Sequence, residues 1–249
     1  MNNKMKLHEA IVFAARAHDG QKRKGTDIPY ISHPMEVMQI LAQIDPYDYD
    51  LQIAGLLHDV VEDTDVSINE IGERFGSHVA AMVDAHSHSK DGKWLVRKMR
   101  EVEEVSQMPL AVKAVVMADK VSNLRSIRND IDEIGDKVWE RFNAPKNLQH
   151  IYYSAIQDAL LEMKDYVETR DIYWEMVALH KDVFVNFLLD EKRGMIWQIS
   201  PTENYVFIRE NLEWIMPYFE PGSDAVKISR IEAEDIEDLW KVKGVKVDE

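Results

Sequence analysis

The segment LQIAGLLHDVVEDT, residues 51–64, most constrains how this chain can fold. Its first seven residues are apolar on nearly every side, which predicts a helix over residues 50–62 that is buried up to its C-terminal half. Four ionisable side chains then follow as two adjacent pairs, namely His58-Asp59 and Glu62-Asp63. Residues four apart share a helix face, so the two pairs form two parallel rows, one turn apart.

Charges at the buried end of such a helix require compensation. Each unpaired carboxylate would cost on the order of several kcal/mol there. A divalent cation resolves the conflict, because it pairs with carboxylates and accepts a neutral imidazole nitrogen as a ligand. The alternative is that the helix end reaches solvent and that His58-Asp59 is only a polar terminus. The dipeptide by itself does not decide between the two.

The composition excludes several kinds of chemistry. The 249 residues include no cysteine, which excludes disulfides, thiolate metal ligands and cysteine nucleophiles and suits a reducing cytoplasm, the location that we expect. No apolar run reaches the length of a membrane span, and the N-terminal residues show no secretory signal.

The net charge of −15 argues against nucleic-acid or anionic-membrane partners, because both require a positive surface. A small phosphorylated substrate remains compatible with this charge, since it needs only a local group of cations or a metal. Lys22-Arg23-Lys24 supplies such a local positive patch.

Most of the chain shows the spacing of amphipathic or buried helices. Helices are predicted over residues 6–21, 34–44, 50–62, 67–75, 77–87, 94–107 and 109–127, with one or two more in 136–168 and a break at Pro145. Runs rich in β-formers follow at 193–211, as two strands or a hairpin, and at 225–231. The predicted fold is therefore mainly α: an all-helical body over residues 1–168 and a small α+β appendage of unknown role over 169–249.

Two further positions, together with the Glu62-Asp63 pair that follows by one turn, favour metal binding by His58-Asp59. His33 stands at a loop-to-helix junction before Pro34, and Asp119 is the only acidic group of the apolar helix 109–127, with Asn123 one turn later. Together, His33, His58, Asp59 and Asp119 supply two imidazoles and two carboxylates. This mixed set suits Mn²⁺, Fe²⁺ or Zn²⁺ better than Mg²⁺.

The order H…HD…D resembles that of the HD-domain metal-dependent phosphohydrolases. The segments GQKRKGTDIPYISHP, AGLLHDVVEDT, RFGSHVAAMVD and MADKVSNLRS resemble, more specifically, the hydrolase domain of RelA/SpoT-type alarmone enzymes. The resemblance covers roughly residues 5–165, and the chain's size is similar to that of the small stand-alone alarmone hydrolases. It implies an all-helical, Mn²⁺-dependent hydrolase that uses metal-activated water to remove the 3′-pyrophosphate from (p)ppGpp, the nucleotide of the stringent response.

The resemblance also implies roles for individual residues. It implies His33, His58, Asp59 and Asp119 as metal ligands, Glu62 and Asp63 as the catalytic pair that activates water, and Arg23, Lys24 and Asn123 as substrate-binding residues. A general base must reach the attacking water, and Glu62, one turn from His58, is placed to do so.

The sequence departs from the family pattern at three places. The loop after Arg23-Lys24 is one residue longer than in the bifunctional enzymes, and Lys120 replaces a common arginine. His86 and His88 stand near a usual Thr-Lys, where we interpret them as polar loop residues rather than phosphate contacts. Two alternatives remain open: hydrolysis of a different nucleotide, and a non-catalytic module that only binds an alarmone. The chain could also form a homo-oligomer.

Overall fold

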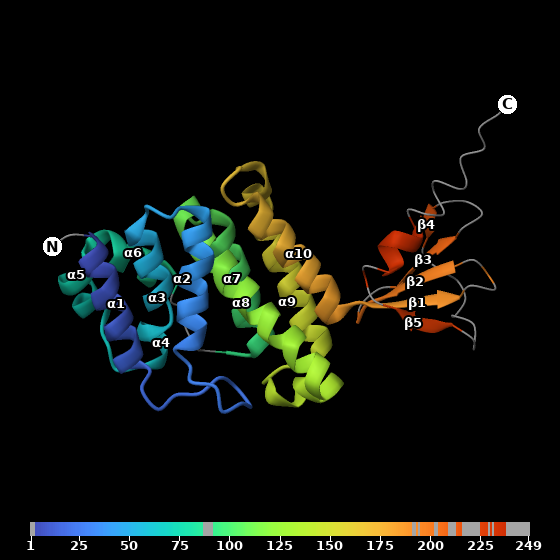
Figure 1. Ribbon diagram of the computed structural model, residues 1–249, viewed down its shortest axis with the longest axis horizontal. Helices are drawn as coiled ribbons and strands as arrows, with labels where there is room; N and C mark the ends of the chain where they lie inside the picture. Colours follow the sequence, from blue (N-terminus) through green and yellow to red (C-terminus); the bar gives the residue numbers. More distant parts are fainter. Residues whose placement is uncertain are drawn as a thin grey trace. The chain divides into compact units, whose positions relative to one another are not determined.

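The computed structural model (Figure 1) describes residues 3–86, 92–190, 193, 195–201, 204–208, 213–215, 225–228, 230 and 232–237. His88 and the residues beside it lie outside this part of the chain. The chain divides into two compact units, Met1–Pro145 with Tyr152–Leu179, and Lys146–Ile151 with His180–Glu249. The expected division into residues 1–168 and 169–249 stays a prediction.

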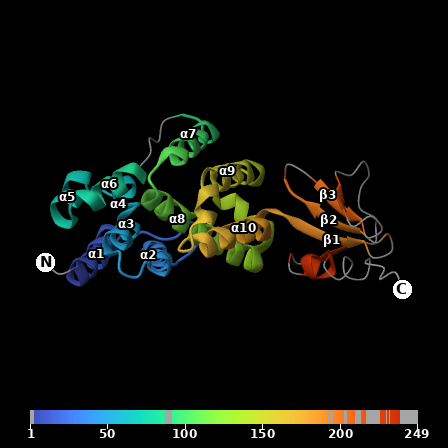
Figure 2. The same cartoon turned by 90° about the horizontal axis from the view of Figure 1, so that it is seen from above.

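Helices make up the first unit, which confirms the mainly α class (Figure 2). The α-helices are α1 (Asn3–Ala17), α2 (Ser32–Ile44), α3 (Tyr49–Leu57), α4 (Val60–Asp63), α5 (Ile68–Phe75), α6 (Ser77–His86), α7 (Trp94–Gln107), α8 (Leu110–Ile134), α9 (Lys146–Ala159) and α10 (Arg170–Phe184). Two 3₁₀ helices, η1 (Gly135–Arg141) and η2 (Leu161–Asp165), flank α9. None of the helices in the described segments combines the length and apolar character that a membrane span requires.

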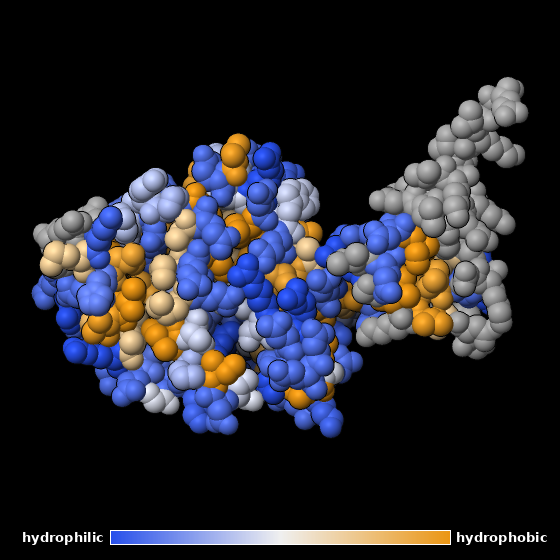
Figure 3. Space-filling model, in the orientation of Figure 1, coloured by the Kyte–Doolittle hydropathy of each residue, from blue (hydrophilic) through white to orange (hydrophobic). Residues whose placement is uncertain are grey.

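Polar residues fix where several helices begin. The Asp48 side chain accepts a hydrogen bond from the Leu51 N–H and caps α3, and the Ser67 side chain accepts from the Glu70 N–H and caps α5. Pro145 immediately precedes α9, at the predicted break. The visible face of the helical unit is largely hydrophilic with scattered apolar side chains (Figure 3), as is usual for a protein surface.

Three predicted helix boundaries are wrong. The first helix ends at Ala17 rather than continuing to residue 21, and Gly20 lies in a turn with φ +76°. Helix α8 continues past residue 127 to Ile134, where Gly135 adopts φ +62°. The third error concerns the helix over residues 50–62, which is broken.

The break falls at His58 and Asp59, between α3 and α4. The His58 Nδ1 lies 2.7 Å from the carbonyl oxygen of Gly55, to which it donates a hydrogen bond. In a continued helix that carbonyl would accept from the N–H of Asp59, four residues later. The His58 side chain therefore competes with the helix for its own acceptor, and the chain turns at this point.

Helix α3 lies at the centre of the helical unit, where it packs against α1, α2, α6 and α8. Its residues Leu51–Leu57 are all buried. At Gly55 the α2 helix approaches so closely that a Cβ atom would lie 2.4 Å from Cδ1 of Leu41. This close contact holds the C-terminal half of α2 and the end of α3 side by side.

The second unit contains a five-stranded antiparallel sheet with strand order β4-β3-β2-β1-β5. Its strands are β1 (Asn186–Asp190), β2 (Met195–Ile199), β3 (Asn204–Ile208), β4 (Glu213–Ile215) and β5 (Val226–Ile228). Strands β2 and β3 form the predicted hairpin, with Trp197 opposite Val206, and β5 falls within the predicted run 225–231. The sequence analysis missed β1 and β4. Phe187, Ile196 and Ala233 form the buried core of this unit.

Candidate metal centre

Four side chains from α2, the α3–α4 turn and α8 converge in the helical unit. The Nε2 atom of His33 lies 3.1 Å from Oδ1 of Asp119 and 3.6 Å from Oδ2 of Asp59. The Nε2 atom of His58 lies 3.0 Å from the same Asp59 oxygen and 3.8 Å from the same Asp119 oxygen. The structure thus brings together all four residues that the sequence suggested as metal ligands.

Hydrogen bonds on the outer side of each ring orient the two imidazoles. Ser122 Oγ donates its hydrogen to Oε2 of Glu36 at 2.8 Å. It therefore accepts a hydrogen bond from Nδ1 of His33, which also lies 2.8 Å away. The Nδ1 of His58 donates to the Gly55 carbonyl, which can only accept. Both rings therefore carry the Nδ1 proton and direct Nε2 toward the carboxylates, as metal-binding histidines do.

The cluster attracts positive charge. Burial acts to lower the pKa of His58, but the Asp59 and Asp119 carboxylates outweigh burial and raise that pKa to about 9. Burial also opposes ionisation of Asp119, yet Lys120 and the two histidines hold its pKa well below the usual value. Against burial, the histidines likewise lower the pKa of Asp59, so both carboxylates are ionised at neutral pH. Without a metal, protonated His58 and Lys120 balance this charge, and a metal cation at the cluster would take the place of the His58 proton.

The donor set fits a divalent metal ion. The Nε2 atom of His58 is fully buried and makes no hydrogen bond within the described part of the chain. Single donor atoms of His33, His58 and Asp119 lie within 4.8 Å of one another. Imidazole nitrogens and carboxylates at this separation suit a transition-metal ion, which would displace the His58 Nε2 proton and bind that nitrogen.

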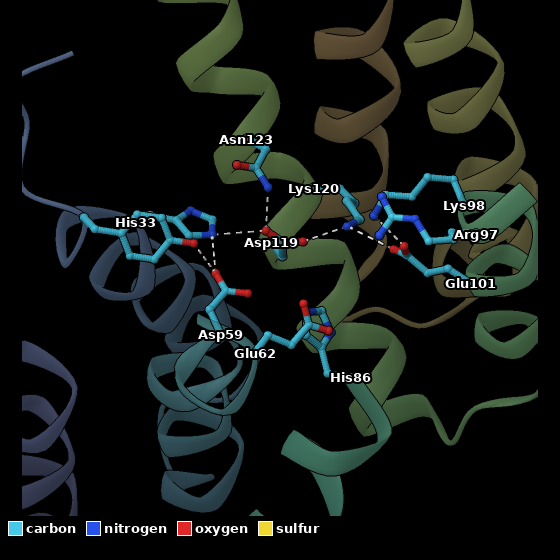
Figure 4. A pocket seen from close by; sticks show the side chains of 11 residues that line it. His33, Asp59, Glu62, His86, Arg97, Lys98, Glu101, Asp119, Lys120 and Asn123 are labelled. Carbon is cyan, nitrogen blue, oxygen red and sulfur yellow. Dashed lines mark hydrogen bonds and ion pairs between the residues drawn. The ribbon is translucent and has the colours of Figure 1, made fainter. Parts of the chain in front are cut away.

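A polar cavity of about 240 Å³ opens beside this cluster (Figure 4). Its lining comprises Tyr30, His33, Asp59, Glu62, His86, Arg97, Lys98, Glu101, Asp119, Lys120 and Asn123. Glu62 thus faces the cavity next to the cluster, whereas its neighbour Asp63 is exposed and does not line it. Because α3 is broken, Glu62 reaches this position from the short α4 helix and not from a continuous helix with His58.

Arg23 and Asn123 lie at one edge of the cluster. The Arg23 guanidinium donates to Oδ1 of Asn123 at 3.0 Å, and Nδ2 of Asn123 donates to Oδ1 of Asp119 at 2.5 Å. Tyr30 donates to Oδ2 of Asp59 at 2.5 Å, and its ring centroid lies 5.9 Å from the Arg23 guanidinium carbon. Lys24 is exposed and does not line the cavity; its Nζ lies 5.6 Å from the Phe142 ring centroid.

The opposite wall of the cavity contains a buried ionic network that the sequence analysis missed. Lys120 Nζ lies 2.8 Å from Oδ2 of Asp119 and 3.4 Å from Oε1 of Glu101. Glu101 also accepts a hydrogen bond from Tyr152 at 2.5 Å, and Lys98 Nζ lies 2.6 Å from its other oxygen. A carboxylate inside the α7 pattern was the only signal in the sequence, and it does not reveal the partners.

His86 belongs to the site and is not a polar loop residue. It is the last residue of α6, it is buried, and its ring centroid lies 5.0 Å from that of His58. Burial, with the nearby His58, lowers the pKa of His86 to about 3, so the ring is neutral. Donor atoms of His58, Asp59 and His86 also lie within 4.8 Å of one another, which makes His86 a further potential metal ligand.

An all-helical domain that surrounds paired histidines and aspartates in the order H…HD…D defines a known class of protein. The family model for the HD domain matches residues 10–147. The chain belongs to the HD domain family.

Individual proteins also show similarity to this chain in sequence and in structure. The guanosine-3′,5′-bis(diphosphate) 3′-pyrophosphohydrolase MESH1 of Homo sapiens is 40% identical over 123 residues, which are 49% of this chain and 69% of that protein. The guanosine-3′,5′-bis(diphosphate) 3′-pyrophosphohydrolase of Vibrio cholerae is 38% identical over 127 residues. These residues are 49% of this chain and 18% of that protein. A solved metazoan orthologue of SpoT that hydrolyses ppGpp gives a TM-score of 0.58 at 25% identity, covering 70% of this chain and 93% of that one.

Proposed function

We propose that this protein is a metal-dependent hydrolase that removes the 3′-pyrophosphate from guanosine tetra- and pentaphosphate, (p)ppGpp. The observation that carries the proposal is the convergence of His33, His58, Asp59 and Asp119 beside a polar cavity that Glu62 also lines. The similarity to MESH1, of which this chain covers 69%, supports the choice of substrate.

The proposed metal is Mn²⁺, held by the four residues of the cluster, because the mixed nitrogen and oxygen donors suit it. When bound, the metal lowers the pKa of a coordinated water molecule and offsets charge on the phosphate group. The outer hydrogen bonds through Ser122 and Gly55 keep the ligand nitrogens directed inward.

Glu62 is the proposed general base, since it faces the cavity next to the cluster. Asp63, the next residue of α4, is proposed to act with it in activating water. Arg23 and Asn123, which are hydrogen-bonded to each other, are proposed to bind the nucleotide. Lys24, exposed and outside the cavity lining, is proposed to add positive charge for the substrate. Water adds to the phosphorus that is attached to the ribose 3′ oxygen, and the bond between that oxygen and phosphorus breaks. The products are pyrophosphate, which contains the water oxygen, and a nucleotide with a free 3′ hydroxyl.

Hydrolysis of a nucleotide panel by the purified protein with Mn²⁺ tests the proposal. We expect ppGpp to yield GDP and pyrophosphate in equal amounts, resolved by anion-exchange chromatography. Cleavage of a 5′-mononucleotide while ppGpp stays intact would instead assign a different substrate. Metal analysis tests the remaining alternative, a module that only binds the nucleotide. A metal content below about half an ion per chain that does not rise after addition of Mn²⁺ would favour this alternative.

A further inference from the structure

Helix α7 contributes two adjacent cations to the wall of the cavity, Arg97 and Lys98, and they differ in their partners. Lys98 lies 2.6 Å from Glu101, and Lys120, in the same ionic network, is paired with both Asp119 and Glu101. Both lysines, Lys98 and Lys120, are therefore already paired with carboxylates of the protein.

Arg97 is different. Its side chain lines the cavity, and its Nε atom is buried without a hydrogen-bond partner in the part of the chain that the structure describes. A buried guanidinium N–H without an acceptor is unfavourable, and buried polar groups of this kind are usually satisfied by a ligand or by water. Figure 4 shows Arg97 entering from α7, on the far side of Lys120 from Asp119 and His33.

The charge of the cavity makes this guanidinium important for an anionic ligand. Four carboxylates line the cavity, namely Asp59, Glu62, Glu101 and Asp119. A phosphate group next to the metal cluster has the metal as its counter-charge, but a second phosphate group of the same nucleotide has none there. This second phosphate group requires a cation that is not already paired with a carboxylate of the protein. A guanidinium group suits the role, because it binds phosphate through two parallel hydrogen bonds.

We propose that Arg97 forms a second anion subsite, which binds the 5′-phosphate groups of the nucleotide while its 3′-pyrophosphate lies at the metal cluster. This inference rests on the proposed function for the orientation of the substrate. It makes Arg97 a specificity residue that selects nucleotides phosphorylated at both the 3′ and 5′ positions.

Comparison of two substrates tests the subsite. Arg97→Gln is assayed on ppGpp and on guanosine 3′-diphosphate, which lacks the 5′ phosphates. We expect kcat/KM for ppGpp to fall about tenfold or more, the loss of a charge-assisted hydrogen bond, with a change of less than about twofold for guanosine 3′-diphosphate. Arg97→Lys, which keeps the charge, should recover part of the loss. An equal fall for both substrates, or no fall for either, would overturn the proposal.

The matched control is Arg100→Gln, on the exposed side of the same helix. It removes the same charge from α7 without touching the cavity, so both substrates should be hydrolysed as by the wild type. Thermal unfolding of both variants should match that of the wild type, which excludes a folding defect.

Binding of GDP, measured by isothermal titration calorimetry, tests the subsite independently of catalysis. GDP carries only the 5′ diphosphate, and we expect Arg97→Gln to weaken its binding about tenfold or more, whereas Arg100→Gln should leave it unchanged. Unchanged GDP affinity in Arg97→Gln would refute the subsite. If the wild type fails to hydrolyse ppGpp, the proposed function is wrong, and the GDP comparison still decides whether Arg97 binds 5′ phosphates.

Discussion

The Nδ1 atom of His33 lies 2.8 Å from Oγ of Ser122, which in turn donates to Glu36 at 2.8 Å. Arg125 holds the other oxygen of Glu36 at 3.0 Å. This chain of hydrogen bonds joins α2 to α8 and fixes which nitrogen of His33 faces the carboxylate cluster. The serine hydroxyl is thus the link between a buried candidate ligand and a charged group outside the site.

Ser122→Ala is expected to weaken metal binding by about 10–100-fold, the usual effect of removing a hydrogen bond behind a ligand. Without the hydroxyl, His33 loses the acceptor that holds its ring and its tautomer. Competition with a chromophoric chelator measures the affinity. Ser122→Thr keeps the hydroxyl and should bind the metal as the wild type does. Equal affinity in the alanine variant would show that the ring is held by packing alone.

Glu62→Gln and Asp59→Asn should separate water activation from metal binding. Loss of a general base typically lowers the rate by ~10²–10⁴-fold, so Glu62→Gln should do so while retaining its metal. Asp59→Asn removes a charged ligand and should lose both the metal and nearly all activity. Initial rates and metal content are measured on the same preparations.

The control for this pair is Asp65→Asn, an exposed carboxylate just beyond α4. Its rate and metal content should equal those of the wild type. Loss of the metal from Glu62→Gln would contradict the division of roles and would make Glu62 a ligand.

Local sequence patterns could predict much of this fold and part of its site. Asp119 was identifiable because it is a single acid within an apolar helix, and the β2–β3 hairpin because its two strands are close in sequence. The break after α3 was not, because it depends on one side chain, His58, competing for a backbone carbonyl. Glu101, Lys120 and Tyr152 meet only through the packing of α7, α8 and α9, which no local pattern reveals.

Gly55→Ala is expected to destabilise the protein by about 1–3 kcal/mol, the usual cost of overpacking a core. The new methyl group would lie 2.4 Å from Cδ1 of Leu41 and 3.3 Å from Cγ1 of Val37, both on fully buried side chains of α2. Urea denaturation measures the loss. Gly72→Ala in α5 is the matched control, since its nearest contact would be 3.6 Å, and it should raise stability by about 0.5–1 kcal/mol. Equal effects in the two variants would contradict the close α2–α3 contact.

Glu101 links the cavity wall to stability at acidic pH. Burial opposes its ionisation, but Lys120 and Lys98 outweigh burial and lower the pKa of Glu101 to about 2. Because the pKa is lower in the folded than in the unfolded protein, the carboxylate stabilises the fold fully above about pH 5 and progressively less as the pH falls toward 2. Glu101→Gln removes this charge and leaves the buried ammonium of Lys120 with Asp119 alone.

At pH 6 we expect Glu101→Gln to cost about 3 kcal/mol of unfolding free energy, the usual penalty for breaking a buried ion pair. The difference from the wild type should shrink by about 1.4 kcal/mol between pH 6 and pH 3.5, because over this range Glu101 takes up a proton in the unfolded wild type while it stays ionised in the folded protein. Urea denaturation at both pH values measures it. Glu103→Gln, at an exposed position of α7, is the control and should show no difference at either pH. A penalty that stays constant with pH would mean that Glu101 stabilises the fold by packing and not by its charge.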